Sequence, residues 1–393
     1  MRILTIFFTL IILIACGGSG DDANTPIKIG EINSYTKNPL YTTPYQKGWE
    51  LAVREVNQNG GLLGRQVEVL VRDDDGKPPE AIKKAHELMA RDEVDLLTGC
   101  FYSNICLALG NFAEQNKKFV MRWYNSYPDE TTRESAYAFA TMAGWTPARA
   151  LANHVSDLGI QKWSSVAFNY AYGQLLVQAF KAQMAENTPS VEFVSEYWPA
   201  LNKLDAGATV GALLRDNPEG IFNGTFGGNF SAFVREGKKR GLDDGRVIVS
   251  NETGIPEYLR VLGSETPEGW IMTGYPRKSI NTSEHQRFVG AYQALHNDEL
   301  PDWMSLIGYV TYNFMFEAVK KAGTTKNEAV IQAMRGLEIE TPLGPVTMRA
   351  RDHLATLGMH VGKTAIVDGE ARLVDWTFYD GADLLINERK VKP

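Results

Sequence analysis

Residues 48–81 read GWELAVREVNQNGGLLGRQVEVLVRDDDGKPPEA, and this stretch carries the repeating unit on which the fold depends. Apolar residues between Trp49 and Val56 recur at helical spacing, and the glycine pair at 60–61 predicts the end of that helix. The run QVEVLVRDDD at 66–75 predicts a strand, and the two prolines shortly after it predict the start of another helix. The stretch therefore predicts a helix, a turn, a strand and a second helix in succession.

The same alternation extends on both sides of this stretch. Short apolar runs at 27–35, 94–100 and 118–124 predict strands, and the segments 78–94 and 104–117 predict the helices between them. Strict alternation of helices with buried apolar strands argues for a parallel sheet that is covered by helices on both faces.

A second unit of the same kind begins around MAGWTPARA, at 142–150. The predicted strands of this unit lie at 164–170, 191–197, 219–226 and 246–252, with helices at 149–159, 172–187 and 231–242 and two long amphipathic helices at 282–296 and 306–323. Two α/β units that follow one another, in a chain of this length, predict two domains.

The chain begins with an apolar leader. After Met1 and Arg2, residues 3–14 are almost all apolar, which is too short for a membrane-spanning anchor and typical of a secretion signal. The leader closes on LIAC at 13–16, which resembles the bacterial lipoprotein cleavage box, where the new N-terminal cysteine takes the lipid. We therefore expect Cys16 to be lipidated, with an ordinary signal peptide cut near Ala15 as the alternative.

Charge and composition exclude several kinds of partner. The formal net charge is −7, and it becomes −8 once Arg2 is removed, with 39 basic and 47 acidic residues. No basic stripe is present, which argues against nucleic acid as a partner. The six histidines are scattered, so we expect no metal and no cofactor. A catalytic serine elbow, a zinc-protease motif, a phosphate-binding loop and a dinucleotide fingerprint are all missing from the sequence, which argues against an enzyme.

The order of elements resembles the type I periplasmic binding proteins of the leucine/isoleucine/valine class, which feed ABC importers. The likeness covers roughly residues 27–380, and its most specific parts are the opening stretch 48–81 and LGPVTMRARDHLATLGMHVGKT at 343–364. It implies an α/β fold of two doubly wound, Rossmann-like lobes joined by a three-segment hinge, with crossings near Gly144, Tyr275 and Arg349.

This resemblance implies a division of the chain. We expect a lipoprotein signal peptide at 1–15, a flexible tether at 16–26, a first lobe made of 27–143 plus 276–348, and a second lobe made of 144–275 plus 349–393.

The segment GCFYSNICLALG at 99–110 joins a predicted strand to a predicted helix, so it lies where open α/β sheets bind ligands. We expect Ser103 to be the N-cap of that helix, and it resembles the carboxylate-binding serine of the family; alternatively, it caps its own helix only. Cys100 and Cys106 lack the CxxC spacing of a redox pair and are either a structural disulfide or two buried thiols.

The next loop, WYNSYPDETT at 123–132, resembles the second carboxylate-holding segment of the family, with Asn125 and Ser126 at the matching positions. Tyr124 and Trp123 replace the small residues usual in the family, and they either line the cavity, narrow it or, for Trp123, pack under the sheet. Arg122 either pairs with a structural carboxylate or binds an anionic ligand.

Four further residues occupy positions that contact ligands in the family. Tyr172 matches a tyrosine that closes over the ligand, Phe226 falls near another aromatic contact, and Tyr41 matches a side-chain pocket position in the loop before the first helix. Glu252 follows a predicted strand, at the family position that takes the ligand ammonium. Alternatively, Phe226 and Tyr41 are ordinary core residues, and Glu252 is an acid at the start of a helix that the helix dipole stabilises.

These features predict a lipid-anchored solute-binding protein of an ABC importer, outside the cytoplasmic membrane. It would close two lobes over a branched-chain or other amino acid, or over a close amide or acid analogue. Its partners would be the small-molecule ligand, the importer's membrane subunits and, through the lipid alone, the membrane. A ligand-sensing receptor subunit shares this fold and site, and an enzyme acting on a small amide or acid is the other alternative.

Overall fold

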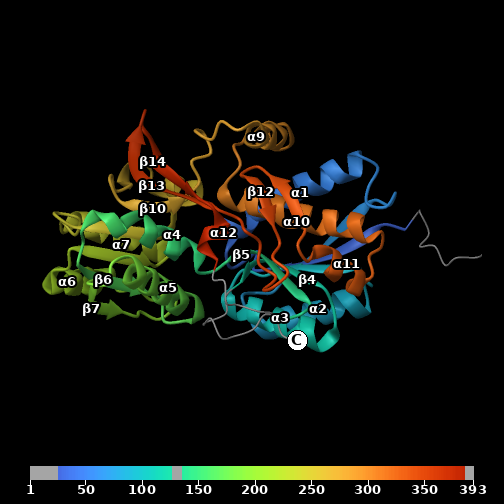
Figure 1. The fold of residues 1–393 in the computed structure, drawn as a ribbon, viewed down its shortest axis with the longest axis horizontal. Coiled ribbons are helices and arrows are strands. Elements are labelled where there is room, and N and C mark those ends of the chain that lie inside the picture. Colours follow the sequence, from blue (N-terminus) through green and yellow to red (C-terminus); the bar gives the residue numbers. More distant parts are fainter. Residues whose placement is uncertain (1–24, 126–134, 386–393) are drawn as a thin grey trace, which may run out of the picture.

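The computed structural model describes residues 25–125 and 135–385, so Cys16 and Ser126 lie outside the described residues. Two α/β lobes lie side by side (Figure 1). We call the lobe built on a five-stranded sheet the first lobe, and the lobe built on a seven-stranded sheet the second lobe.

The sheet of the first lobe is parallel throughout, in the order β2-β1-β3-β4-β5. Its strands are β1 (Ile27–Asn33), β2 (Val67–Asp73), β3 (Leu96–Gly99), β4 (Val120–Asn125) and β5 (Ala138–Ala143).

Helices cover both faces of this sheet because successive strand residues point to opposite sides. Ile27 and Ile29 of β1 belong to the core cluster beneath α1 (Pro39–Gln58) and α10 (Trp303–Ala322). Ile32 belongs to a second cluster, beneath α2 (Pro78–Ala90) and α3 (Ser103–Asn116). The nearly continuous apolar strands of the sequence are thus explained by burial on two faces.

The opening stretch of the sequence folds as predicted, into the end of α1, a glycine turn, β2 and the start of α2. Gly61 has a φ of +81°, and its N–H donates to the carbonyl of Val56 at 2.9 Å. A Cβ at this position would lie 2.0 Å from the carbonyl oxygen of Arg65, so only glycine fits the turn.

The second lobe has the sheet order β14-β13-β10-β9-β8-β6-β7, in which β13 runs antiparallel to both of its neighbours, β14 and β10, and the other neighbours run parallel. The helix α4 packs on α5, and α6 packs on α7. The elements are β6 (Lys162–Ala167), β7 (Glu192–Tyr197), β8 (Gly220–Gly224), β9 (Val247–Gly254), β10 (Ile271–Gly274), β13 (Met359–Val367), β14 (Glu370–Tyr379), α4 (Thr146–Val155), α5 (Ala171–Asn187), α6 (Ala206–Asp216), α7 (Gly227–Lys239), α8 (Pro256–Leu262) and α12 (Gly381–Leu384), with short 3₁₀ turns at Ser156–Leu158 and Gly263–Glu265.

The chain crosses between the lobes three times. It leaves the first sheet after β5, and it returns after β10 through α9 (Ser283–Leu295), α10, α11 (Asn327–Met334) and the hairpin of β11 (Glu338–Thr341) and β12 (Gly344–Thr347). It then enters the second sheet again as β13. This arrangement confirms the predicted fold class of two doubly wound lobes joined by three segments.

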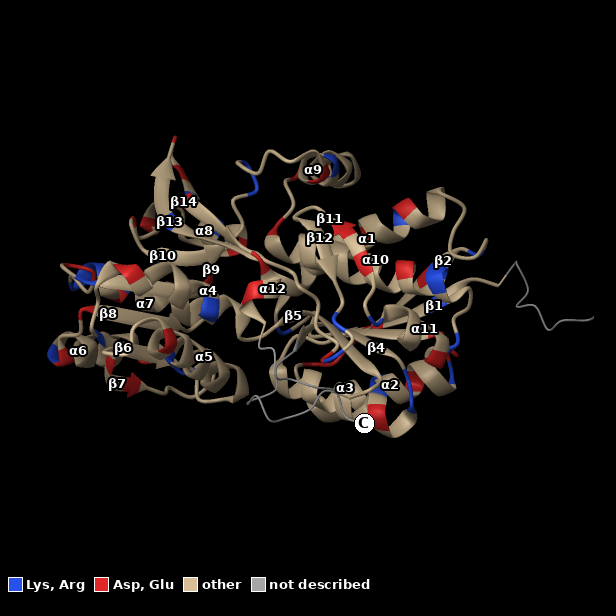
Figure 2. Cartoon of the chain, viewed as in Figure 1, with Lys and Arg blue, Asp and Glu red and all other residues tan. Residues whose placement is uncertain are grey.

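Charged residues of both signs are spread over the two lobes (Figure 2). In the part of the chain that the structure describes, no helix combines the length and the apolar character needed to cross a bilayer.

Candidate functional site

A small cavity lies between the two lobes. Its volume is about 30 Å³. Its lining residues come from both lobes and lie at or just after the carboxyl ends of parallel strands: Tyr41, Phe101, Tyr102, Ser103, Trp123, Tyr124, Tyr170, Tyr172, Phe226 and Glu252. Ligands bind at this end of open α/β sheets, where the strand order reverses.

In the first lobe the strand order reverses between β1 and β3, and each strand leads into one part of the cavity wall. Tyr41 lies in the first turn of α1, not in the preceding loop, so the predicted helix start was too late. Ser103 lines the cavity, but it is the first residue of α3; Tyr102 holds the N-cap position. The prediction that Ser103 is the N-cap was therefore wrong by one residue, and the side chain of Tyr102 makes no capping hydrogen bond.

A tight turn brings Ser103 into the cavity wall. Gly99 and Cys100 have φ values of +118° and +83°, and a Cβ on Gly99 would lie 2.0 Å from the carbonyl oxygen of Ile32. A disulfide joins Cys100 to Cys106 in the first turns of α3, with an S–S distance of 2.07 Å. Both sulfurs lie in the core under α3, away from the cavity lining.

The carboxyl end of β4 supplies two aromatic rings to the cavity. Trp123 and Tyr124 are 6% and 3% exposed, and the hydroxyl of Tyr124 donates to the carbonyl of Gly144 at 3.0 Å. Asn125 is the last residue of β4, and Ser126 lies outside the described residues, so neither side chain is placed. Arg122 is buried on the other face, where it donates to the carbonyl of Cys106 at 3.2 Å.

In the second lobe the strand order reverses between β6 and β8, and both strands lead to aromatic residues in the cavity wall. Tyr170 and Tyr172 stand at the start of α5, and Phe226 is the N-cap residue of α7. The helix α5 begins at Ala171, one residue before the predicted start at 172.

Glu252 points into the cavity because of a bulge in β9. Three residues, from Asn251 to Thr253, lie opposite a single residue of β10, where the register shifts. Glu252 itself has a φ of +52°, and its N–H donates to the hydroxyl of Thr273 at 2.6 Å. Bulges of this kind re-aim side chains next to functional sites, and a left-handed non-glycine residue costs about 1–3 kcal/mol.

The carboxylate of Glu252 has one hydrogen bond within the cavity wall. Its Oε2 accepts from the hydroxyl of Tyr172 at 2.7 Å, and that hydroxyl accepts in turn from Nδ2 of Asn251 at 2.7 Å. Burial raises the pKa of Glu252 to about 7, and the hydrogen bond from Tyr172 opposes this rise. A carboxyl in this setting is poised to gain a positively charged partner.

Aromatic contacts close the cavity between the lobes. The rings of Tyr124 and Tyr172 meet edge-to-face with centroids 5.3 Å apart. The hydroxyl of Tyr41 contacts the hydroxyl of Tyr258, which also accepts from the N–H of Gly227 at 2.5 Å. The lobes therefore stand in contact on two sides of the cavity.

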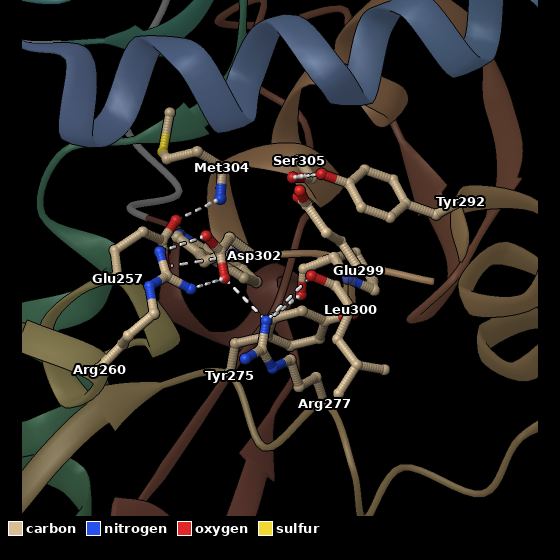
Figure 3. Close-up of polar contacts among 12 residues, drawn as sticks. Glu257, Arg260, Tyr275, Arg277, Tyr292, Glu299, Leu300, Asp302, Met304 and Ser305 are labelled. Carbon is tan, nitrogen blue, oxygen red and sulfur yellow. Dashed lines mark hydrogen bonds and ion pairs between the residues drawn. The ribbon is translucent and has the colours of Figure 1, made fainter. Parts of the chain in front are cut away.

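A polar network also joins the lobes, beside the second crossing (Figure 3). Glu257 of α8 is fully buried and accepts from the N–H groups of Trp303 and Met304, at 3.3 and 3.0 Å, at the start of α10. Burial raises the pKa of Glu257, and the nearby Asp302 adds to the rise. This carboxyl occupies the positive end of a helix in the other lobe.

Asp302, the N-cap residue of α10, completes the network. It accepts from Arg260 of α8 at 2.9 Å and from Arg277 of the second crossing at 2.7 Å. Arg277 also donates to the carbonyls of Leu300 and Pro301, at 3.0 and 3.1 Å. Three segments from both lobes are thereby held together.

Sequence reasoning missed Phe101, Tyr102 and Tyr170 as cavity residues, and it missed Glu257 as a contact between lobes. The first three follow β3 and β6, the strands at which the order reverses, so their position after these strands was an available signal. Glu257 could not have been found in this way, because its partners lie 46 and 47 residues away.

The site can enclose a small molecule between a carboxylate and the start of a helix. The N–H groups of Ser103 and Asn104, the first two of α3, have no acceptor within the helix and can receive a ligand carboxylate. Within the described residues, no group of three or more His, Cys, Asp or Glu side chains is arranged to hold a metal ion.

The chain resembles several known binding proteins along most of its length. It is 23% identical over 356 residues to a Leu/Ile/Val-binding protein homolog from Brucella melitensis, covering 88% of this chain and 93% of that protein. A leucine-, isoleucine-, valine-, threonine- and alanine-binding protein from Brucella ovis in a closed conformation superposes with a TM-score of 0.82 at 18% identity, covering 94% of this chain and 99% of that one. A solute-binding protein of an ABC transporter from Rhodopseudomonas palustris, in complex with 3,4-dihydroxybenzoic acid, superposes with a TM-score of 0.80 at 22% identity, covering 91% and 98%.

The family model described as "Periplasmic binding protein" matches residues 26–370, which is most of the chain. Together with two lobes that meet over a cavity at the carboxyl ends of their strands, this match identifies the chain as a member of the periplasmic binding protein family.

Proposed function

We propose that this protein is the solute-binding protein of an ABC importer and that its ligand is an amino acid, branched-chain or other, or a close amide or acid analogue. The relatives named above include Leu/Ile/Val-binding protein homologs and an ABC transporter solute-binding protein, which supports the transport role. Their ligands include both amino acids and an aromatic acid, so the choice between these classes rests on the cavity of this chain.

One observation carries the amino-acid assignment: Ser103 and Glu252 line the same cavity from opposite lobes. A zwitterion would place its carboxylate at Ser103 and the start of α3, and its ammonium at Glu252. Hydrogen bonds to charged groups contribute roughly 1.5–3 kcal/mol each. A ligand with an acid group but no amine would leave Glu252 without a partner.

The ligand would act by favouring the closed arrangement of the lobes. A ligand that binds two conformations equally well does not shift the balance between them. A zwitterion that bridges Ser103 and Glu252 makes both contacts only when the lobes meet, so its binding favours closure. The importer's membrane subunits would then recognise the outer surfaces of the closed form.

The leader sequence supports a location outside the cytoplasmic membrane. The sequence at 13–16 supports lipidation of Cys16, which would hold the protein at the outer face of a bacterial membrane or in the periplasm, with residues 17–26 as a tether.

A thermal-shift screen tests this proposal. Amino acids, short amides and aromatic acids are added in turn, and a ligand at 100 times its dissociation constant stabilises the folded state by about 2.7 kcal/mol. Stabilisation by one or more amino acids supports the proposal. Stabilisation by benzoate or dihydroxybenzoate alone, or conversion of the ligand into a product, contradicts it.

A further inference from the structure

The wall of the cavity is mostly aromatic, and its rings contact one another in a continuous series. In the first lobe, Tyr41 contacts Phe101 with centroids 5.0 Å apart, Phe101 contacts Trp123 at 5.9 Å, and Trp123 contacts Tyr124 at 5.0 Å. The series crosses to the second lobe where Tyr124 meets Tyr172 at 5.3 Å. Each ring is therefore held in place by another ring.

In the second lobe three rings form a triangle. The centroids of Tyr170, Tyr172 and Phe226 are 6.1, 6.2 and 6.4 Å apart in pairs. With Tyr102, which contacts Phe101 at 4.9 Å, eight of the ten lining side chains are aromatic.

The tyrosine hydroxyls are largely engaged by the protein itself. The hydroxyl of Tyr102 accepts from Nδ2 of Asn38 at 2.9 Å, and that of Tyr124 donates to the carbonyl of Gly144 at 3.0 Å. The hydroxyl of Tyr172 is engaged by its two neighbours described above. The surface that these residues offer to a ligand is therefore aromatic ring more than hydroxyl.

Glu252 is the single charged residue among the ten that line the cavity. A buried carboxylate surrounded by rings favours a cation, because the faces of aromatic rings also attract positive charge. The cation can be of two kinds. A primary ammonium carries three N–H donors that need acceptors, whereas a methylated ammonium replaces donors with methyl groups that need none.

The number of hydrogen-bond acceptors in the cavity wall, compared with the number of aromatic rings, distinguishes a primary ammonium from a methylated one. Besides the engaged tyrosine hydroxyls, only Glu252, Ser103 and the hydroxyl of Tyr170 bring side-chain oxygens to the wall. Resting on the proposed amino-acid function, we propose that the preferred ligand is an N-methylated amino acid, with its methylated ammonium enclosed by the rings and paired with Glu252, and its carboxylate at Ser103.

The size of the cavity argues for a compact group over an aromatic ring. A cavity that binds benzene measures about 150 Å³, and this cavity is only about 30 Å³. Any ligand must part the rings, and an ammonium head with a single methyl group parts them less than a benzene ring does.

The test is calorimetry of the purified protein with a series in which only the nitrogen changes: glycine, N-methylglycine, N,N-dimethylglycine and glycine betaine. L-leucine and benzoate are added as separate arms. We expect the dissociation constant to fall at least tenfold from glycine to the most tightly bound methylated member. Affinity that is unchanged or lost with methylation overturns the inference, and so does a series with no binding at all.

The two separate arms distinguish failure of this inference from failure of the proposed function. Binding of L-leucine or glycine without any gain from methylation overturns the inference alone and leaves the amino-acid function standing. Binding of benzoate together with no binding by any amine overturns both.

A pair of variants tests the role of the rings independently. Phe226→Leu removes a ring from the cavity wall but keeps an apolar side chain, and Phe378→Leu makes the same change on the surface, where Phe378 is 39% exposed. We expect Phe226→Leu to weaken the binding of glycine betaine at least fivefold more than the binding of glycine. Phe378→Leu should leave the dissociation constants of both ligands unchanged. Equal weakening of both ligands by Phe226→Leu overturns the role of the ring.

Discussion

The hydroxyl of Tyr172 donates to the carboxylate of Glu252 at 2.7 Å, inside a cavity whose other walls are aromatic. The two residues come from the start of α5 and from a bulge in β9, 80 residues apart in the chain. This pair supplies the charge in the cavity wall and holds it in one orientation.

The first prediction concerns the charge of Glu252. The substitution Glu252→Gln keeps the shape of the side chain and removes the counter-ion of a ligand ammonium, which typically costs about 3–5 kcal/mol, or roughly a hundredfold or more in affinity. Calorimetry should show this loss for the best amino-acid ligand and little loss for its deaminated analogue. Equal losses for both ligands would mean that Glu252 does not meet an ammonium.

The second prediction concerns pH. The pKa of Glu252 is raised to about 7, so in the ligand-free protein this carboxyl is mostly protonated below pH 7, and a cationic ligand must displace the proton. Affinity should therefore fall as pH falls, by roughly tenfold or more between pH 7.5 and pH 5.5. The facing tyrosines 124, 170 and 172 have raised pKa values and stay neutral in this range. Glu252→Gln should abolish the dependence; an identical pH profile in this variant would contradict the assignment.

The stability of the ligand-free protein should depend on pH in the opposite sense. Between the usual pKa of 4.5 and about 7, the folded state binds the Glu252 proton and the unfolded state does not. Stability contributed by this group is thus lost as pH rises through that window. The midpoint temperature of thermal unfolding of the ligand-free protein should fall more steeply from pH 5 to pH 8 in the wild type than in Glu252→Gln.

The disulfide of Cys100 and Cys106 should matter for stability and not for binding. A disulfide that closes a loop this short lowers the entropy of the unfolded chain and thereby stabilises the folded state by about 2 kcal/mol. Both sulfurs lie in the core, away from the cavity. A double Ala variant should unfold at lower denaturant concentration and bind its ligand with unchanged affinity. Loss of binding in a variant that remains folded would contradict this prediction.

The contact of Glu257 with the start of α10 should stabilise the arrangement of the two lobes. Glu257→Met keeps the length of the side chain but leaves the N–H groups of Trp303 and Met304 without their acceptor, which costs about 1–3 kcal/mol. Denaturant unfolding should show this loss, and small-angle scattering should show a larger mean radius of gyration.

Glu257→Gln is the matched control, because its amide oxygen can still accept from the helix. It should retain most of the stability and the compact shape that Glu257→Met loses. If both variants behave like the wild type, the contact between α8 and α10 does not help to hold the lobes together.

The last prediction concerns the membrane. Cys16→Ser should release the protein from membranes without changing its affinity for the ligand, because Cys16 directly follows the predicted leader and lies before the first strand of the fold. Cell fractionation followed by calorimetry measures both properties. Unchanged partition of the variant into membranes would show that the anchor is not on this cysteine.

The sequence predicted most of the elements that have a strong period of their own. The helix α1, its glycine turn and β2 were found because the pattern of apolar residues changes from helical spacing to a strand within one stretch. By contrast, β5, with the sequence AFATMA, was missed because its small residues carry no clear period, although all six are buried. The helices α6 and α8 were missed in the same way, since both are short.

For the cavity, the sequence predicted which residues follow the carboxyl ends of the strands, and the parallel sheet then brings those ends together. Ser103, Tyr124 and Glu252 were placed at strand ends in this way, whereas Tyr41, Tyr172 and Phe226 were named from the resemblance to the periplasmic binding proteins. All six line one cavity. Where boundaries differed, as at Ser103, the helix begins one residue earlier than predicted, because the end of a helix is set by backbone geometry that side-chain patterns describe only loosely.

The succession of strands and helices along the chain, the presence of two α/β units and the position of Ser103 and Glu252 after strands were therefore determined by the local pattern of the sequence alone. What only the tertiary structure decided are relationships between distant segments: the bulge that turns Glu252 toward Tyr172, the ring contact of Tyr124 with Tyr172, and the docking of Glu257 on α10. The physical reason is that periodicity records which face of an element is buried, whereas the partner across the interface depends on how the two lobes pack, which no local pattern encodes.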